Sequence, residues 1–549
     1  MKVKSKPRTT FIIVLWEALV IVLFPTALEA FSFSDSIFFS RDETKFPPNP
    51  YGQKAREFWD SFSQKDLAKL EKFFSTCLPE EKLAEISAVE RAIKLINLRE
   101  KLGEVALAKV ETRRPEEIII TFSSTPDSFW QLGLNFNLIG GKLILVAMII
   151  EETGQDALLP PLPALDLDQA LQKLDGEISL ATAEDRFSGV VLIAKDFNPI
   201  FFKAYGLASR EFDVPNRLNT KFNLGSINKI FTKVAIAHLV EKGLLSLGTK
   251  LGSILPNYPN PEAREKVTVK NLVAMTAGIG DFFGPDFQKT PKEFLRHNRD
   301  YLPLFASKPL AFEPGTKQLY SNGSYVVLGE IIAKVSGMDY YEYIQKNIFD
   351  VAGMKESAWY EADELVSNLA EGYTREKAGW KDGQPSRQKK LDEENSFLEK
   401  ETPREKKMDE AKMAGEQQAM VKDENRKISW RRNIYTRPAR GSAAGGGYAT
   451  AEDLLRFIRA LDEGKLLSLV FTDWVFGGPE PRPGQVRNQE AVNRENWNLG
   501  LAGGAPGINA SLEFEARSGW TVIVLANLDP PAATDISRLV KRYLRAVIN

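Results

Sequence analysis

The sequence predicts an α+β protein with two folded domains. Three observations lead to this prediction. The chain has 549 residues, which is too long for one hydrophobic core; a proline-rich stretch at 160–163 divides it; and helical periodicity gives way to strand periodicity within the first part. Hydrophobic residues make up 43% of the chain and charged residues 26%, as in soluble globular proteins, which excludes a multi-span membrane protein.

Residues 1–30 have the pattern of a secretory signal peptide. Four basic residues precede an apolar run of roughly fourteen residues at 11–24, and Ala30 offers a small residue for cleavage. This pattern predicts an extracytoplasmic protein, either periplasmic or secreted. The segment is cleaved or is retained as an N-terminal anchor.

Residues 50–153 are expected to form a small α+β domain. Helical periodicity covers 51–102, and β-rich stretches follow at 117–122, 130–136 and 143–150, the last after a Gly140-Gly141 turn that can close a hairpin. In order and length this region resembles a cystatin-like roll. A structural or dimerising module and a ligand-binding pocket are the two alternatives for its role.

Residues 154–164 form a stiff proline-rich linker, and a second domain spans 165–549. Within it, 376–432 is rich in mixed charges and poor in apolar residues, so it cannot bury enough surface to offset the entropy of ordering. We expect a solvated insertion, with a helical hairpin or a partner-binding tail as the alternative.

Charge and composition restrict the chemistry. Because 72 basic residues face 73 acidic ones, the net charge of −1 gives no reason to expect a nucleic acid partner, and a small molecule or peptide is the expected substrate. Cys77 is the only cysteine and there are only two histidines, so neither an intrachain disulfide nor a Cys/His zinc site is expected. The sequence predicts no metal and no cofactor.

Ser226 and Lys229 are the predicted nucleophile and base. They are three residues apart at the start of an apolar helical stretch, so hydroxyl and amine lie on one face, and a lysine kept neutral by burial can take the serine proton. Backbone amides at a helix start can also stabilise an oxyanion. Ser386 and Lys389 have the same spacing, but they lie in the charged insertion without an apolar helix behind them.

Tyr320-Ser321-Asn322 provides a second polar element. It is expected on a loop before another apolar helical stretch, where the phenol of Tyr320 can relay protons and the amide of Asn322 can orient a substrate carbonyl. We expect the phenol to lose its proton more easily beside a lysine ammonium.

These two elements resemble the motifs of the serine β-lactamase-related family, which includes class C β-lactamases, D-alanyl-D-alanine carboxypeptidases and β-lactamase-like esterases. The resemblance extends to the first strand at 187–195, to 267–278 and to the small-residue turn at 445–454. It implies a central antiparallel sheet flanked by helices, with a helical subdomain beside the active-site cleft. We expect 187–194 and 520–525 to be adjacent central strands.

The third motif of that family departs from the usual pattern. Members carry Lys-Thr-Gly or His-x-Gly on the strand that lines the cleft, whereas this chain has Leu501-Ala502-Gly503 there. The amide of about Gly504 can still bind an oxyanion, because it needs no side chain. The missing cation or imidazole disfavours substrates that present a carboxylate, provided that Arg517 or Lys541 does not take its place.

Two functions remain open on the sequence alone. The first is a serine hydrolase of the esterase or peptidase type that forms an acyl-enzyme, with Ser226, Lys229 and Tyr320 as catalytic residues, Asn322, Gly503 and Gly504 in substrate binding, and weak β-lactamase activity at most. The second is a catalytically impaired relative that binds cell-wall peptides or a protein partner.

Overall fold

The computed structural model describes residues 45–125, 128–153, 158, 162–375, 429–481 and 492–547. The predicted signal peptide, most of the predicted linker and residues 376–428 of the predicted insertion lie outside these ranges. Within them, no helix is both long enough and apolar enough to cross a membrane.

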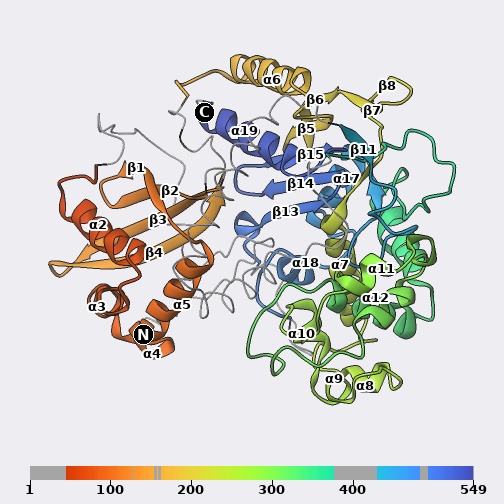
Figure 1. Cartoon of the computed structure of the whole chain (residues 1–549), viewed down its shortest axis with the longest axis horizontal. Coiled ribbons are helices and arrows are strands. Elements are labelled where there is room, and N and C mark those ends of the chain that lie inside the picture. The colour runs from red at the N-terminus through yellow and green to blue at the C-terminus, as the bar shows by residue number, and fades with distance from the viewer. Residues whose placement is uncertain are drawn as a thin grey trace, which may run out of the picture.

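The N-terminal unit, residues 45–153, consists of helices followed by an antiparallel sheet with the strand order β1-β2-β3-β4 (Figure 1). Its helices are α2 (Pro50–Ser63), α3 (Leu67–Cys77), α4 (Glu80–Glu85) and α5 (Ala88–Lys101). Its strands are β1 (Ala106–Arg114), β2 (Glu117–Thr125), β3 (Ser128–Ile139) and β4 (Lys142–Thr153).

A hydrophobic core of its own holds this unit together. Phe58, Phe62 and Phe73 from the helices are fully buried, and Phe122 and Phe136 from the sheet complete the cluster. The predicted hairpin is confirmed, because both residues of the Gly140-Gly141 turn have positive φ and join β3 to β4. The sequence reading missed β1, which alternates weakly. A cystatin-like roll stays a prediction.

The C-terminal unit, residues 162–547, is built on a five-stranded antiparallel sheet with the order β13-β14-β15-β5-β6. The expected neighbours 187–194 and 520–525 are paired, since β5 and β15 are in register from Gly189 with Ala526 to Lys195 with Trp520. The five strands are β5 (Gly189–Lys195), β6 (Asn198–Tyr205), β13 (Asn498–Ala505), β14 (Ile508–Glu515) and β15 (Trp520–Ala526).

Helices cover both faces of this sheet, as the strand alternation requires. Val191 and Ile193 face the layer that contains α6 (Leu167–Ala183) and α19 (Ala532–Ala546), and the intervening Val190 and Leu192 belong to the opposite, larger core. That larger core is shared with α7 (Lys229–Glu241) and α17 (Ala451–Asp462).

A mainly helical region between β9 (Phe222–Asn223) and β12 (Tyr448–Ala449) lies beside this sheet (Figure 1). Its helices and turns are η2 (Gly225–Asn228), α8 (Leu251–Ile254), α9 (Pro261–Lys266), α10 (Val269–Val273), α11 (Pro285–Lys289), η3 (Lys292–Phe294), η4 (Asn298–Leu304), α12 (Asn322–Ser336), α13 (Tyr340–Ile344), η5 (Gln345–Phe349) and α14 (Asp350–Ala352). Beyond it, α18 (Leu469–Val475) and η7 (Arg494–Asn496) precede β13.

Short two-stranded pairs complete the unit. They are β7 (Leu207–Ser209) with β8 (Val214–Pro215), β9 (Phe222–Asn223) with β12 (Tyr448–Ala449), and β10 (Tyr373–Arg375) with β11 (Trp430–Arg432). The last pair places residues 430–432, at the end of the predicted insertion, in strand β11, which pairs with β10.

The two ends of the C-terminal unit meet. The amide of Leu165 donates to the carbonyl of Ala546 at 2.9 Å, and Leu165 forms an isolated parallel bridge with Val547.

Candidate active site

Ser226 and Lys229 are brought together by a tight turn. The sequence reading placed both on one α-helix, but Ser226 lies in the 3₁₀ turn η2 and Lys229 is the first residue of α7. A 3₁₀ turn has three residues per turn, so side chains at i and i+3 eclipse one another. The two side chains therefore align even more closely than on an α-helix, and Lys229 Nζ lies 3.0 Å from Ser226 Oγ.

Lys229 is buried and has only polar partners without a full charge. Nζ donates to Asn322 Oδ1 at 2.7 Å and to the carbonyl oxygen of Ala444 at 2.6 Å. Burial lowers the pKa of Lys229 from 10.5 to about 7, against the opposing effect of the Asp281 carboxylate. A large share of Lys229 is therefore neutral at pH 7, as a general base must be.

Tyr320 completes the group, with its hydroxyl oxygen 2.7 Å from Ser226 Oγ. The expected direction of its pKa shift was wrong. Burial raises the pKa of Tyr320 to about 12, and the negative charge of Asp281 acts in the same direction, while the hydrogen bond with Ser226 opposes them. Desolvation outweighs the opposing hydrogen bond with Ser226, so Tyr320 keeps its proton and can act as a donor.

Asn322 is the first residue of α12 rather than part of the loop. Ser321 caps this helix by accepting a hydrogen bond from the amide of Ser324 at 2.9 Å. The side chain of Asn322 is 7% exposed, and its Nδ2 donates to Asp281 Oδ2 at 2.7 Å. Nδ2 carries a second hydrogen, so the predicted role of holding a substrate carbonyl stays open.

Asp281 and Ala444 were missed by sequence reasoning. Asp281 lies three residues after Gly278, at the end of the segment that carries part of the family resemblance, and this position was the available signal for it. Ala444 contributes only a backbone carbonyl, for which no side chain gives a signal.

Strand β13 passes close to the turn that holds Ser226. A Cβ atom at position 503 would overlap the carbonyl oxygen of Leu224 and lie 3.1 Å from the Ser226 amide nitrogen. At Gly225, where φ is +50°, a Cβ atom would lie 2.9 Å from the Gly504 amide nitrogen. Glycine at both positions allows two backbones to touch, and this brings the amides of Ser226 and Gly504 to adjoining places.

Leu501 lies on the same strand, two residues before Gly503, and packs in part against the larger core. Neither of the two alternative cations replaces the missing polar group. Arg517 is exposed in the turn between β14 and β15. Lys541, on α19, forms an ion pair with Glu513, with its Nζ 2.9 Å from the carboxylate.

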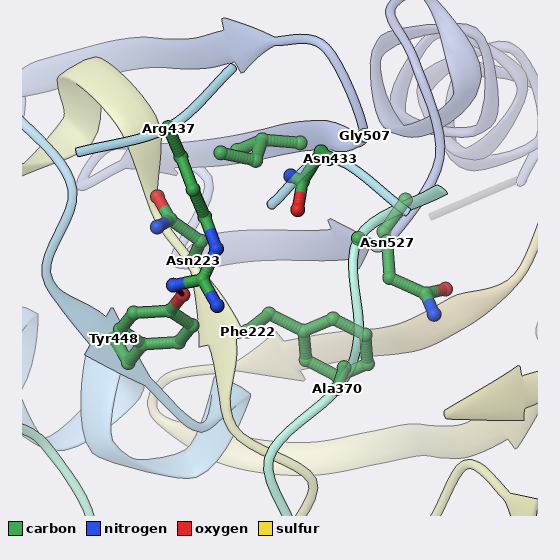
Figure 2. Close-up of a pocket in the computed structure, with 11 residues that line it drawn as sticks. Phe222, Asn223, Ala370, Asn433, Arg437, Tyr448, Gly507 and Asn527 are labelled. Atoms are coloured by element: carbon green, nitrogen blue, oxygen red, sulfur yellow. Dashed lines mark hydrogen bonds between the residues drawn. The ribbon is translucent and has the colours of Figure 1, made fainter. Parts of the chain in front are cut away.

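A small polar cavity lies beside β9 and β12, lined by Asn223, Arg437, Tyr448 and Asn527 among others (Figure 2). Its volume of about 10 Å³ has room for about one water molecule. Ser226, Lys229 and Tyr320 do not line it, so this cavity is separate from the catalytic candidates.

Residues 167–545 match the sequence model of the family described as Beta-lactamase. This chain belongs to the beta-lactamase family. The match spans most of the chain and confirms the resemblance drawn from the Ser226 and Tyr320 motifs. The fold class is confirmed by the same match and by the antiparallel sheet flanked by helices.

Individual members of the beta-lactamase family show the same relationship. Penicillin-binding protein 4* of Bacillus subtilis (strain 168) is 33% identical over 193 residues, which cover 34% of this chain and 42% of that protein. A beta-lactamase of Yersinia enterocolitica is 28% identical over 36% of this chain and 47% of its own length. This chain therefore spans about half the length of the curated relatives that it matches.

Among solved structures, a penicillin-binding protein from Bacillus halodurans aligns with a TM-score of 0.51 and 28% identity. The alignment covers 66% of this chain and 98% of that protein. About a third of this chain thus has no counterpart in that relative.

Proposed function

We propose that this chain is a serine hydrolase that forms an acyl-enzyme at Ser226 from an uncharged ester or amide. The observation that carries the proposal is the convergence of Lys229 Nζ at 3.0 Å and the Tyr320 hydroxyl at 2.7 Å on Ser226 Oγ. Membership of the beta-lactamase family supports the same class of reaction.

The hydrogen-bond partners of Lys229 define the direction of proton transfer. A neutral amine has two hydrogens and one lone pair, and two of its three neighbours, Asn322 Oδ1 and the carbonyl of Ala444, can only accept. The lone pair is therefore left for Ser226, whose hydroxyl then donates to Lys229. Tyr320, which keeps its proton, donates to Ser226 Oγ from the other side.

Acylation follows from this arrangement. Lys229 takes the hydroxyl proton while Ser226 Oγ bonds to the substrate carbonyl carbon, and the oxyanion that forms is stabilised by the amides of Ser226 and Gly504. Collapse of this intermediate breaks the bond to the leaving oxygen or nitrogen, which takes the proton of Tyr320. The ammonium of Lys229 returns its proton to Tyr320. Water then attacks the acyl carbon while Lys229 takes its proton. Ser226 Oγ leaves with the proton of Tyr320, which releases the acid, and Lys229 returns its proton to Tyr320.

Leu501 is the basis for proposing an uncharged substrate. A leucine on this strand cannot form the ion pair or charged hydrogen bond that a substrate carboxylate needs. Burying an unpaired carboxylate beside it costs on the order of several kcal/mol. Esters and amides without a carboxylate avoid this penalty. Turnover of β-lactams or D-alanyl peptides is expected to be weak.

A fluorophosphonate probe tests the nucleophile. We expect the wild-type protein to be labelled and Ser226→Ala to be unlabelled, because the probe phosphonylates only an activated serine. Ser386→Ala is the matched control, since it removes the other serine with a lysine three residues later. Equal labelling of wild type and Ser226→Ala would overturn the assignment.

A catalytically impaired relative that binds cell-wall peptides is the second candidate, and Leu501 is the observation that favours it. A panel of p-nitrophenyl esters, a chromogenic cephalosporin and D-alanyl-D-alanine peptides separates the two. Ester turnover that Lys229→Ala abolishes excludes the binding-only function. A gain on the two carboxylate substrates in Leu501→His, with ester turnover retained, identifies the leucine as the cause of the restriction.

We further propose an extracytoplasmic location, supported by the signal-like pattern of residues 1–30. Fractionation of cells that express the full chain, followed by N-terminal sequencing of the recovered protein, tests both export and cleavage. Recovery of the intact chain in the cytoplasm alone contradicts this proposal.

A further inference from the structure

Asp281 lies behind the candidate catalytic residues, on the loop between α10 and α11. Its Oδ2 accepts from the backbone amide of Asn322 at 3.1 Å and from Asn322 Nδ2 at 2.7 Å, and its Oδ1 accepts from the amide of Phe283 at 2.9 Å. The hydroxyl of Ser321 also donates to the carbonyl of Gly280 at 3.0 Å. The carboxylate is thus held by three N–H donors, and the loop is fastened to the start of α12.

A carboxylate at this place determines which way the Asn322 amide points. An ionised carboxylate can only accept hydrogen bonds, so the amide end that faces Asp281 must be the NH₂ group. The carbonyl end, Oδ1, must then face Lys229 Nζ, where it accepts at 2.7 Å. With the amide turned over, an N–H would instead point at Lys229 and compete with the Ser226 hydroxyl for the lysine lone pair.

We propose that Asp281 is a positioning residue that fixes the Asn322 amide and thereby directs the Lys229 lone pair at Ser226. The inference rests on the proposed function, because it assigns to Asp281 the orientation of the base used there. Asp281 acts through Asn322 and touches no reacting atom.

The charge of Asp281 adds an effect on pH dependence. Its negative charge favours the protonated form of Lys229 and so raises the pKa that burial lowers. The other titratable groups that face Lys229 in the described part of the chain are the phenols of Tyr320 and Tyr325, whose rings lie 4.8 Å and 5.8 Å from Nζ. Strand β13 brings uncharged residues to this site, and the Ala444 segment brings backbone.

The test compares labelling by the uncharged fluorophosphonate across pH in Asp281→Ala, Asp281→Asn and the control Asp286→Asn. Asp286 lies on the neighbouring helix α11 and forms an ion pair with Lys308 at 3.2 Å. The Asp286→Asn substitution changes the net charge by the same amount as the Asp281 substitutions. We expect labelling to slow roughly ten- to a hundredfold in Asp281→Ala, as for a misplaced catalytic group. In both Asp281 variants the acid limb should move to lower pH, and the control should match the wild type.

A double-mutant cycle shows whether Asp281 acts through Asn322. Asp281→Ala should have little further effect on the plateau rate of labelling in an Asn322→Ala background, because the amide that it orients is gone. Equal effects in both backgrounds, or a lower melting temperature with an unmoved acid limb, would overturn the inference and leave a structural role.

A measurement without catalysis separates this inference from the proposed function. The side-chain NH₂ signal of Asn322, identified by its loss in Asn322→Ala, should be protected from hydrogen exchange in the wild type and exposed in Asp281→Ala. Failure of the wild type to react with the probe overturns the proposed function, whereas an unprotected Asn322 signal in the wild type overturns the role of Asp281.

Discussion

The surroundings of Lys229 set the pH at which this protein is expected to work. Burial lowers the pKa of Lys229 to about 7, and only the neutral amine can take the Ser226 proton. The rate of labelling should therefore rise tenfold per pH unit below about pH 7 and level off above it. Tyr320, with its pKa raised to about 12, should cause no decline up to pH 9.

Stopped assays of fluorophosphonate labelling between pH 5 and 9 measure this limb. Lys229→Arg should be inactive throughout, because a guanidinium stays protonated. Lys233→Met is the control: Lys233 is half-buried one turn later on α7, desolvation lowers its pKa to about 8, and its Nζ donates to the carbonyls of Trp474 and Val475. Loss of the acid limb in Lys233→Met would show that the limb reports the titration of Lys233 and not of Lys229.

At the scale of elements, the contact between β13 and the turn η2 decides whether the oxyanion can be stabilised. The methyl group of Gly503→Ala would overlap the Leu224 carbonyl and push the strand away from the Ser226 amide. We expect kcat for a p-nitrophenyl ester to fall roughly a hundredfold, as when one oxyanion donor is lost. Gly500→Ala is the matched control on the same strand, because its methyl group meets nothing within 4 Å. Similar rates for the two variants would contradict the assignment of this contact.

The elements that follow from the sequence are those whose signals are local. The Gly140-Gly141 hairpin, the two buried central strands and the spacing of Ser226 and Lys229 each depend on a few consecutive residues. The 3₁₀ geometry of η2 could not be read, because a 3₁₀ turn and the first turn of an α-helix share one residue pattern. Asp281 could not be assigned because its contact with Asn322 joins residues 41 positions apart through a loop.

The direction of the Tyr320 pKa shift failed for a related reason. A pair of residues in sequence indicates which groups meet, but the desolvation that dominates both pKa values depends on everything packed around them. The burial of Lys229 could be anticipated from its apolar helix, whereas the burial of Tyr320 arises from the tertiary fold.

At the scale of the whole molecule, two separate sets of buried residues predict that the C-terminal unit folds alone. One core draws on residues between 55 and 150, and the others on residues between 165 and 543. A chain that begins at Leu162 should therefore be labelled by the fluorophosphonate at the wild-type rate. A chain that begins at residue 185 lacks α6, which covers one face of the central sheet, and should be unstable. Circular dichroism and labelling check both, and loss of labelling in the longer chain would show that the N-terminal unit serves the site.

The bridge between Leu165 and Val547 has a consequence for engineering. Polypeptide joined ahead of the first residue and polypeptide joined behind the last would leave the domain from a single spot on its surface. The C-terminal unit could therefore be inserted into an exposed loop of an unrelated protein without separating the two ends of that loop. The same adjacency would allow circular permutation, in which residues near Leu165 and Val547 are joined and new termini are made elsewhere.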